Sequence, residues 1–163
     1  MNKRVLVTYS SRTGSTAEVA EEIGKVLAAR GLAVDVRPIK EDPPAEAYQA
    51  LVIGSPVRMG NWQAEAVDYV KRNQKSLGQI PVAVFTVHAL NTGEDEQSRG
   101  YRAAYLDAIR PLLKPVAEGY FPGQVDPERL CAFERLTLRA EAGPAKDMRD
   151  WDKIRGWAQR LPI

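Results

Sequence analysis

Short apolar runs alternate with amphipathic helical patterns along most of the chain, and this alternation is the feature that most restricts its fold. Residues Arg4 to Tyr9 form the first run, which is typical of a strand buried on both faces. The next segment, 17–30, places apolar side chains at helical spacing, and Gly31 follows as a stop. Repetition of strand and helix predicts an α/β fold, a three-layer sandwich with a parallel sheet in the middle.

The same pattern continues beyond the first unit. Further strands are predicted at 32–39, 50–54, 81–87 and 115–120. Right-handed crossovers then give a five-stranded sheet in the order 2-1-3-4-5, with a ligand site at the carboxyl ends of the central strands. Asn61 is expected to cap a helix that has Trp62 in its first turn. The polar stretch 91–100 is expected to be a loop, and 101–113 the helix after it.

Two helical segments are predicted after Gly123. Segment 127–140 carries apolar residues around much of its circumference, which favours deep burial over a contact surface for a partner. Segment 151–161 keeps a clean helical spacing, so we expect it to dock on the sheet. The chain has no repeat, linker or break in composition, which predicts one domain over residues 1–163.

Composition excludes several classes of protein. The 163 residues are 44% hydrophobic and 27% charged, with a net charge of +2, so nucleic acid is not an expected partner. A lone cysteine, Cys131, and a single histidine indicate no metal site and no internal disulfide. The first apolar run is too short for a signal peptide or a membrane span. A cytoplasmic protein without an integral membrane segment is therefore expected.

The turn after the first strand combines five hydroxyl side chains, between Ser10 and Thr16, with one glycine, Gly14. Backbone amides at the start of a helix carry positive partial charge, and hydroxyl groups add neutral donors. Gly14 allows the main chain to approach a ligand closely. The turn is therefore predicted to hold a phosphate group. A helix cap that binds nothing is the simpler alternative, but a cap needs only one hydroxyl.

Other phosphate-binding loops do not match this turn. A nucleoside-triphosphate loop needs a lysine before its Ser or Thr, whereas Ser15 and Thr16 directly follow Gly14. The glycine pattern of a dinucleotide site is missing as well. A cysteine phosphatase would need its nucleophile here, but Cys131 is far along the chain. A phospho-accepting receiver would need an aspartate where Gly54 and Ser55 stand.

The turn and the helix after it resemble the signature of the flavodoxin family. The matching positions are Tyr9, Ser11, Gly14, Thr16, Ala20 and Ile23. Thr8 departs from this pattern, because the family usually has an apolar residue there. The resemblance implies a flavodoxin-like fold, flavin mononucleotide (FMN) as the cofactor, and electron transfer as the function.

The resemblance also implies two loops that enclose the flavin ring. The first is similar to a loop of the flavodoxin-like, quinone-dependent protoporphyrinogen dehydrogenases, from which it keeps Arg58 and Gly60, while Met59 replaces an aromatic residue. The second, after the fourth strand, contains His88. The predicted cofactor-binding residues are Ser10, Ser11, Arg12, Thr13, Gly14, Ser15, Thr16, Ser55, Pro56, Val57, Arg58, Met59, Gly60, Asn61, Thr86, Val87, His88 and Leu90. No catalytic residue is assigned.

Three functions remain compatible with the sequence. One is an electron carrier that docks on redox partner proteins. Another is a protoporphyrinogen dehydrogenase that passes electrons through FMN to a quinone, with peripheral membrane contact. The last is a binding module that has lost its flavin. Carrier flavodoxins are typically acidic, whereas this chain has a pI near 8.7. The basic, aromatic tail of the dehydrogenases is only weakly represented, at 124–140.

Overall fold

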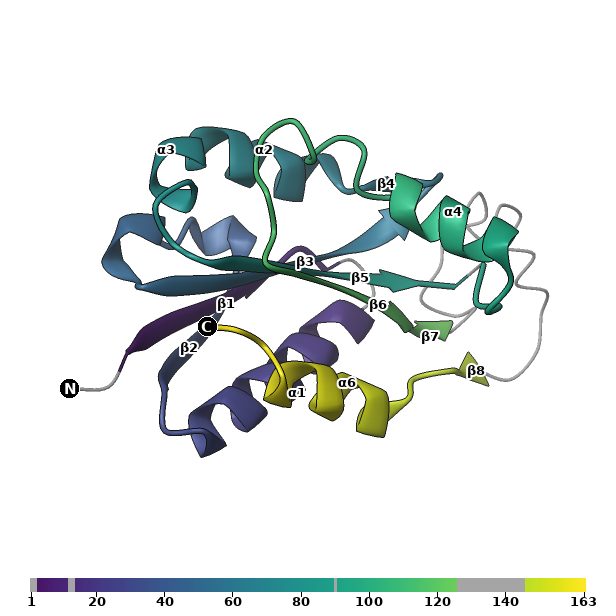
Figure 1. Ribbon diagram of the computed structural model, residues 1–163, viewed down its shortest axis with the longest axis horizontal. Helices are drawn as coiled ribbons and strands as arrows, with labels where there is room; N and C mark the ends of the chain where they lie inside the picture. The colour runs from purple at the N-terminus through teal and green to yellow at the C-terminus, as the bar shows by residue number, and fades with distance from the viewer. Residues whose placement is uncertain (1–2, 12–13, 90, 126–145) are drawn as a thin grey trace.

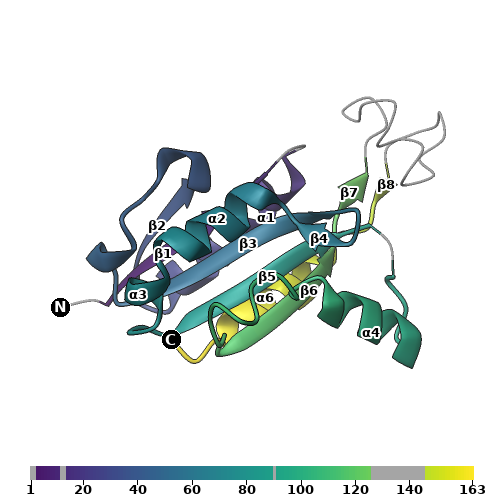
Figure 2. The same ribbon diagram turned by 90° about the horizontal axis from the view of Figure 1, so that it is seen from above.

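The computed structural model describes residues 3–11, 14–89, 91–125 and 146–163. Its main sheet has five parallel strands in the order β2-β1-β3-β5-β6, seen edge to edge in Figure 2. Their bounds are Arg4–Tyr9 for β1, Ala33–Pro38 for β2, Ala50–Arg58 for β3, Val82–His88 for β5 and Ala117–Pro122 for β6. The predicted order of the five parallel strands is confirmed, because β5 and β6 are the fourth and fifth of them along the chain.

Three short strands add to this sheet at its carboxyl edge or lie beyond it. Strand β4 (Asn61–Trp62) runs back antiparallel to the end of β3. Strands β7 (Gln124–Val125) and β8 (Lys146–Asp147) pair with each other. Strand β3 is longer than predicted, because Ser55 and Pro56 look like a turn in the sequence but pair with β5.

Helices cover both faces of the sheet (Figure 1). Helices α1 (Ser15–Ala29) and α6 (Trp151–Gln159) lie on one face, and α2 (Ala64–Arg72) and α3 (Gln74–Leu77) on the other. Two single-turn 3-10 helices, Ile39–Glu41 and Ala45–Ala47, join β2 to β3. Ile154 and Ala158 of α6 are fully buried against α1 and β6, which confirms that the last helix docks on the sheet. The helix predicted at 127–140 lies outside the described residues.

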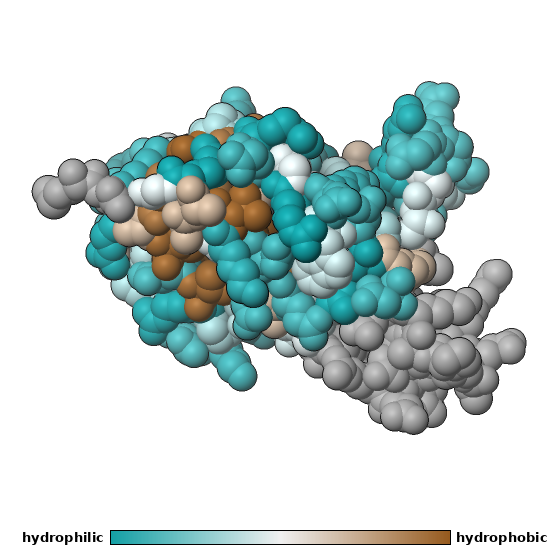
Figure 3. Space-filling view, turned by 90° about the horizontal axis from the view of Figure 1, so that it is seen from below, coloured by the Kyte–Doolittle hydropathy of each residue, from teal (hydrophilic) through white to brown (hydrophobic). Residues whose placement is uncertain are grey.

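Each face of the sheet has its own apolar core. Leu6, Leu51 and Val84 face α2, whereas Val7, Val52 and Phe85 face α1 and α6. This alternation follows from the two-residue period of a strand, and it explains why the central strands read as continuous apolar runs. Figure 3 shows apolar surface on the α1 and α6 side, toward the amino ends of the strands. In the described part of the chain, no helix is long and apolar enough to cross a membrane.

The predicted helix at 101–113 is wrong in its position. Helix α4 spans Glu96–Ala104, so it begins inside the stretch 91–100 that was expected to be a loop and ends early in the predicted helix, and residues 105–112 form tight turns. Asp95 caps α4 by accepting a hydrogen bond from the Ser98 amide at 3.0 Å. Because α4 buries none of its side chains, apolar periodicity could not reveal it. Pro111, which cannot donate a helical hydrogen bond, interrupts the apolar pattern that suggested the later helix.

The predicted capping role of Asn61 is also wrong. Gln63 occupies the position before α2, and Asn61 lies in β4, where its side-chain amide donates to the Met59 carbonyl at 3.1 Å. Trp62 therefore belongs to β4 and not to the helix. The sequence pattern missed this because a two-residue strand has no detectable period.

Thr8 provides a test of the core. Its side chain is fully buried, and among the described residues its hydroxyl has no hydrogen-bond partner. A buried hydroxyl without a partner costs free energy, so Thr8→Val, which keeps the shape, should raise the free energy of unfolding by about 1 kcal/mol. Thr86→Val should lower it, because the Thr86 hydroxyl accepts a bond from Trp62. Urea unfolding measures both, and a loss of stability in Thr8→Val would show that this hydroxyl is satisfied in solution.

Candidate functional site

The turn between β1 and α1 opens at the carboxyl edge of the sheet. Gly14 precedes the helix with φ of 92°, in the left-handed region that favours glycine, and it has no side chain that could cap α1. Its amide donates to the Ser11 hydroxyl at 3.2 Å. The first helical hydrogen bond runs from Glu18 to the Gly14 carbonyl. The amides of Thr16 and Ala17 therefore precede the helical ladder, and amides in this position can bind an anion.

Two hydroxyl residues begin this helix. Ser15 and Thr16 are 5% and 2% exposed, so both are set into the edge of the protein. Ser11, in contrast, is exposed. Arg12 and Thr13, which were predicted to bind the same group, lie outside the described residues.

The first predicted loop is a tight hairpin between β3 and β4. Met59 and Gly60 occupy its two central positions, with φ of 54° and 78°. Positive φ at both positions defines a type I′ turn, for which Asn-Gly is the favoured sequence. A methionine is strained in the first position. The Met59 side chain is 66% exposed, so this strained position presents an apolar side chain at the tip of the hairpin.

A pocket of about 570 Å³ separates this hairpin from the turn after β1. Its lining residues are Ser11, Arg58, Met59, Asn61, Trp62, Gln63, Ala64 and Glu65. The structure thus brings together residues from both predicted segments, although 47 positions separate Ser11 from Arg58. Sequence reasoning did not predict Trp62, Gln63, Ala64 and Glu65 at the site, because it placed them at the start of a helix capped by Asn61. Arg58 pairs with Asn61 and Val57 with Trp62, so the chain folds back after Met59 and Gly60 and brings the residues from Trp62 onward beside Arg58.

Several other predicted residues are buried or half-buried and do not line the pocket. Ser10, which directly follows β1, is fully buried, as are Ser55 in β3 and Thr86 in β5, and Pro56 and Val57 are half-buried. The Trp62 indole N–H donates to the Thr86 hydroxyl at 2.9 Å.

The second predicted loop starts with Val87 and His88, which are 5% and 4% exposed and do not line the pocket. The His88 ring lies 5.9 Å from the Tyr105 ring, centroid to centroid. Asn91, with φ of 57°, donates to the Tyr105 hydroxyl at 2.8 Å. Leu90 lies outside the described residues. These contacts tie the end of β5 to the turns that follow α4.

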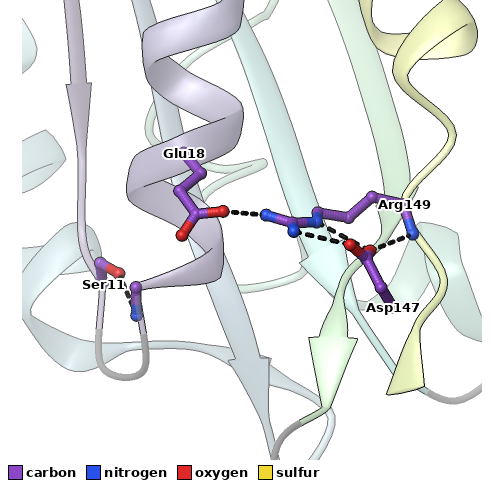
Figure 4. A network of polar contacts seen from close by, with 5 residues as sticks. Ser11, Glu18, Asp147 and Arg149 are labelled. Carbon is purple, nitrogen blue, oxygen red and sulfur yellow. Dashed lines mark hydrogen bonds and ion pairs between the residues drawn. The ribbon is translucent and has the colours of Figure 1, made fainter. Parts of the chain in front are cut away.

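Charge near the start of α1 is balanced by a network of three residues (Figure 4). Glu18, in the first turn, would repel an anion, but its carboxylate pairs with the Arg149 guanidinium. Arg149 also donates to Asp147 from Nε at 2.8 Å and from Nη2 at 2.7 Å. The guanidinium lowers the pKa of Asp147. This network links α1 to β8, and it leaves the positive end of the helix electrostatically open.

The donor set of the pocket suits an organic anion with an apolar portion. The Ser11 hydroxyl lies on one side, four residues before α1 begins, and Arg58, Met59 and Trp62 line the other side, where Glu65 is the one acidic lining residue among those described. In the described part of the chain, no group of three or more His, Cys, Asp or Glu residues could hold a metal ion.

Comparisons with known proteins agree with this architecture. A family model described as a flavodoxin domain matches residues 6–152. The chain therefore belongs to the flavodoxin domain family. A curated relative, protoporphyrinogen IX dehydrogenase [quinone] of Escherichia coli strain K12, is 23% identical over 172 residues, which cover 97% of this chain and 94% of the relative.

Solved structures share the fold at low identity. The two-electron reduced flavodoxin of Megasphaera elsdenii has a TM-score of 0.57 and 15% identity, over 96% of this chain and 99% of that one. A Fusobacterium nucleatum flavodoxin mutant bound to flavin mononucleotide has a TM-score of 0.52 and 15% identity, over 71% of this chain and 68% of that one. At these identities the likeness shows the fold alone.

The strained turn at Met59 gives a prediction. Met59→Asn installs the favoured residue of a type I′ turn, so the free energy of unfolding should rise by about 1 kcal/mol. Gly60→Ala should lower it by about the same amount, because alanine resists a φ of 78°. Chemical denaturation of both variants measures these changes. Two unchanged midpoints would show that the hairpin has a different turn in solution.

Proposed function

We propose that the protein binds FMN in the pocket between the turn after β1 and the β3-β4 hairpin, and that it works by electron transfer. The observation that carries this proposal is a pocket of about 570 Å³ whose lining joins Ser11, from the turn that leads into α1, to a hairpin that presents Arg58 and Met59. The fold supports it, because parallel α/β sheets bind ligands at the carboxyl ends of their strands.

The phosphate of FMN would be held at the start of α1. The first-turn amides point toward the turn, and Ser15 and Thr16 would add hydroxyl donors. Arg149 neutralises Glu18, the one acidic residue of that first turn. The predicted roles of Ser11, Arg12 and Thr13 at the phosphate remain part of the proposal.

The flavin ring would lie against the hairpin. Met59 offers a soft apolar surface, and Arg58 an exposed guanidinium that can reach the polar edge of the ring. When bound, FMN supplies one- and two-electron transfer through this ring. The residues of the chain orient the ring, exclude water from one side of it and set the charge around it.

Two kinds of redox function fit this site. An electron carrier that docks on partner proteins is one, and the flavodoxin relatives support it. A dehydrogenase that moves electrons from a porphyrinogen to a quinone is the second, and the full-length similarity to the Escherichia coli enzyme supports it. The loop keeps Arg58 and Gly60 of the dehydrogenase loop, and the chain is slightly basic. Both features are reasons to test the dehydrogenase activity directly.

One experiment separates these functions. The purified protein is reconstituted with FMN, its visible spectrum is recorded, and it is then mixed with protoporphyrinogen and a quinone. Flavin absorbance without turnover supports the carrier, and turnover supports the dehydrogenase. A protein that takes up no FMN contradicts both and leaves a flavin-free binding module.

The phosphate site predicts a strong preference for FMN over riboflavin. Without the phosphate, the helix-start amides and hydroxyls would be desolvated without a partner. Thr16→Ala should weaken FMN binding by about 1–2 kcal/mol, roughly tenfold, and leave riboflavin binding unchanged. Fluorescence titration of the apoprotein measures both affinities, with Thr8→Val as a control that removes a hydroxyl remote from the pocket. Equal affinity of the wild-type protein for the two flavins would place the phosphate elsewhere.

Arg58 should set the reduction potential of the bound flavin. A guanidinium about 4–6 Å from the ring stabilises the charge gained on reduction by roughly 1–3 kcal/mol at an effective dielectric of about 30–60, between the value near a protein surface and that of water. That energy corresponds to some tens of millivolts, up to about 130 mV. Solvent screening places an exposed arginine toward the lower end. Arg58→Gln should therefore lower the potential at full reduction and barely change the affinity for oxidised FMN.

Spectroelectrochemistry of the wild type and the variant measures this shift. Lys25→Gln removes the same charge from an exposed position on α1 and should leave the potential unchanged. A potential that stays the same in Arg58→Gln would show that Arg58 is a solvated loop charge.

A further inference from the structure

Three buried hydroxyl groups form a row across the central strands, on the face that carries α2. Ser55 pairs with Thr86 in the parallel register of β3 and β5, and the Ser10 amide donates to the Gly54 carbonyl beside them. All three residues are 0% exposed. Below this row, the buried side chains of the three strands on this face are apolar, apart from Thr8. The row therefore marks the place where the core ends and the pocket begins.

Each hydroxyl of the row contacts one of two consecutive residues, Trp62 or Gln63. Thr86 accepts from the Trp62 indole N–H at 2.9 Å. Ser55 accepts from the Gln63 amide at 3.0 Å, and the Ser10 hydroxyl donates to the Gln63 side-chain carbonyl. Hydrogen bonds therefore hold the junction between the hairpin and α2 to β3, to β5 and to the residue that follows β1.

The hairpin needs such an anchor. Strand β4 has two residues, and only two residue pairs join it to β3. A two-stranded hairpin of this size is marginal in water. Arg58, Met59, Gly60 and Asn61 are all exposed, whereas Trp62 is 4% exposed. One buried side chain thus holds the segment that forms a wall of the pocket.

We infer that Trp62 is the positioning residue of this pocket, and that its hydrogen bond to Thr86 holds Arg58 and Met59 at the ligand. Trp62 also lines the pocket, so its positioning role is the part that depends on the hydrogen bond to Thr86 and acts through the hairpin. The effect on flavin binding rests on the proposed function, whereas the effect on the hairpin does not. The alternative is that Trp62 only fills space in the core, in which case phenylalanine would replace it without loss at the pocket.

The variants that separate these roles are Trp62→Phe, Thr86→Val and the double variant. Each single change removes the hydrogen bond and keeps most of the apolar volume. Trp157→Phe is the control for a smaller ring, because Trp157 packs on Phe121 on the opposite face of the sheet, 5.5 Å between centroids. Tyr69→Phe is the control for a lost buried hydrogen bond, because its hydroxyl donates to the Pro43 carbonyl at 2.8 Å.

The first measurement is amide hydrogen exchange in the apoprotein. Exchange at the Arg58-Gln63 amides should become roughly tenfold faster in each single variant than in the wild type. The double variant should exchange no faster than either single variant, because both substitutions remove the same hydrogen bond. Amides of β1 should keep their protection, and neither control should change the hairpin. Hairpin exchange equal to that of the wild type would overturn the inference and leave Trp62 as core packing.

The second measurement is FMN affinity by fluorescence titration. Each variant should bind FMN roughly tenfold more weakly, the size expected for one lost buried hydrogen bond, while both controls bind as the wild type does. Faster hairpin exchange with unchanged affinity would overturn the link between the hairpin and the pocket. A wild-type protein that takes up no FMN would contradict the proposed function, and hydrogen exchange alone would then decide whether Trp62 positions the hairpin.

Discussion

The site depends on how α1 begins. A parallel strand that continues into a helix brings the positive end of the helix to the carboxyl edge of the sheet, and Gly14 makes that junction possible with a left-handed backbone. Gly14 has no side chain to cap the helix, so the Thr16 and Ala17 amides have no side-chain cap at this position. Glu18 would oppose an anion there, but Arg149 engages it from the end of the chain. The last segment of the sequence thus contributes to the electrostatics of the first turn.

The second half of the pocket is held by polar groups inside the sheet. Ser10, just after β1, and Ser55 and Thr86, in β3 and β5, are buried polar residues, and each contacts Trp62 or Gln63. A buried hydroxyl is costly unless it is paired, so these residues stabilise one particular placement of the hairpin. Thr8, which has no partner among the described residues, shows the contrast.

Sequence reasoning predicted the sheet because apolar runs and helical periodicity both report burial. Strand order followed from those patterns, the phosphate-binding turn after β1 was predicted from its hydroxyl residues, and the loop at Arg58 from the resemblance to the flavodoxin family. It failed where burial gives no signal. Helix α4 buries no side chain, so its first half was predicted as a loop. Strand β4 is too short for a period, so Asn61 was taken for a helix cap. The part played by Trp62 depends on a contact with Thr86, 24 positions away, which local patterns cannot report.

The central claim is that the turn after β1 and the β3-β4 hairpin together form one FMN site. Its most direct test is titration of uniformly ¹⁵N-labelled apoprotein with FMN, followed by amide chemical shifts. The account predicts saturable binding, with the largest changes at Gly14, Ser15 and Thr16 and at the hairpin from Arg58 to Trp62. Changes confined to other surfaces, such as the apolar area on the α1 and α6 side, or no saturable change at all, would contradict it.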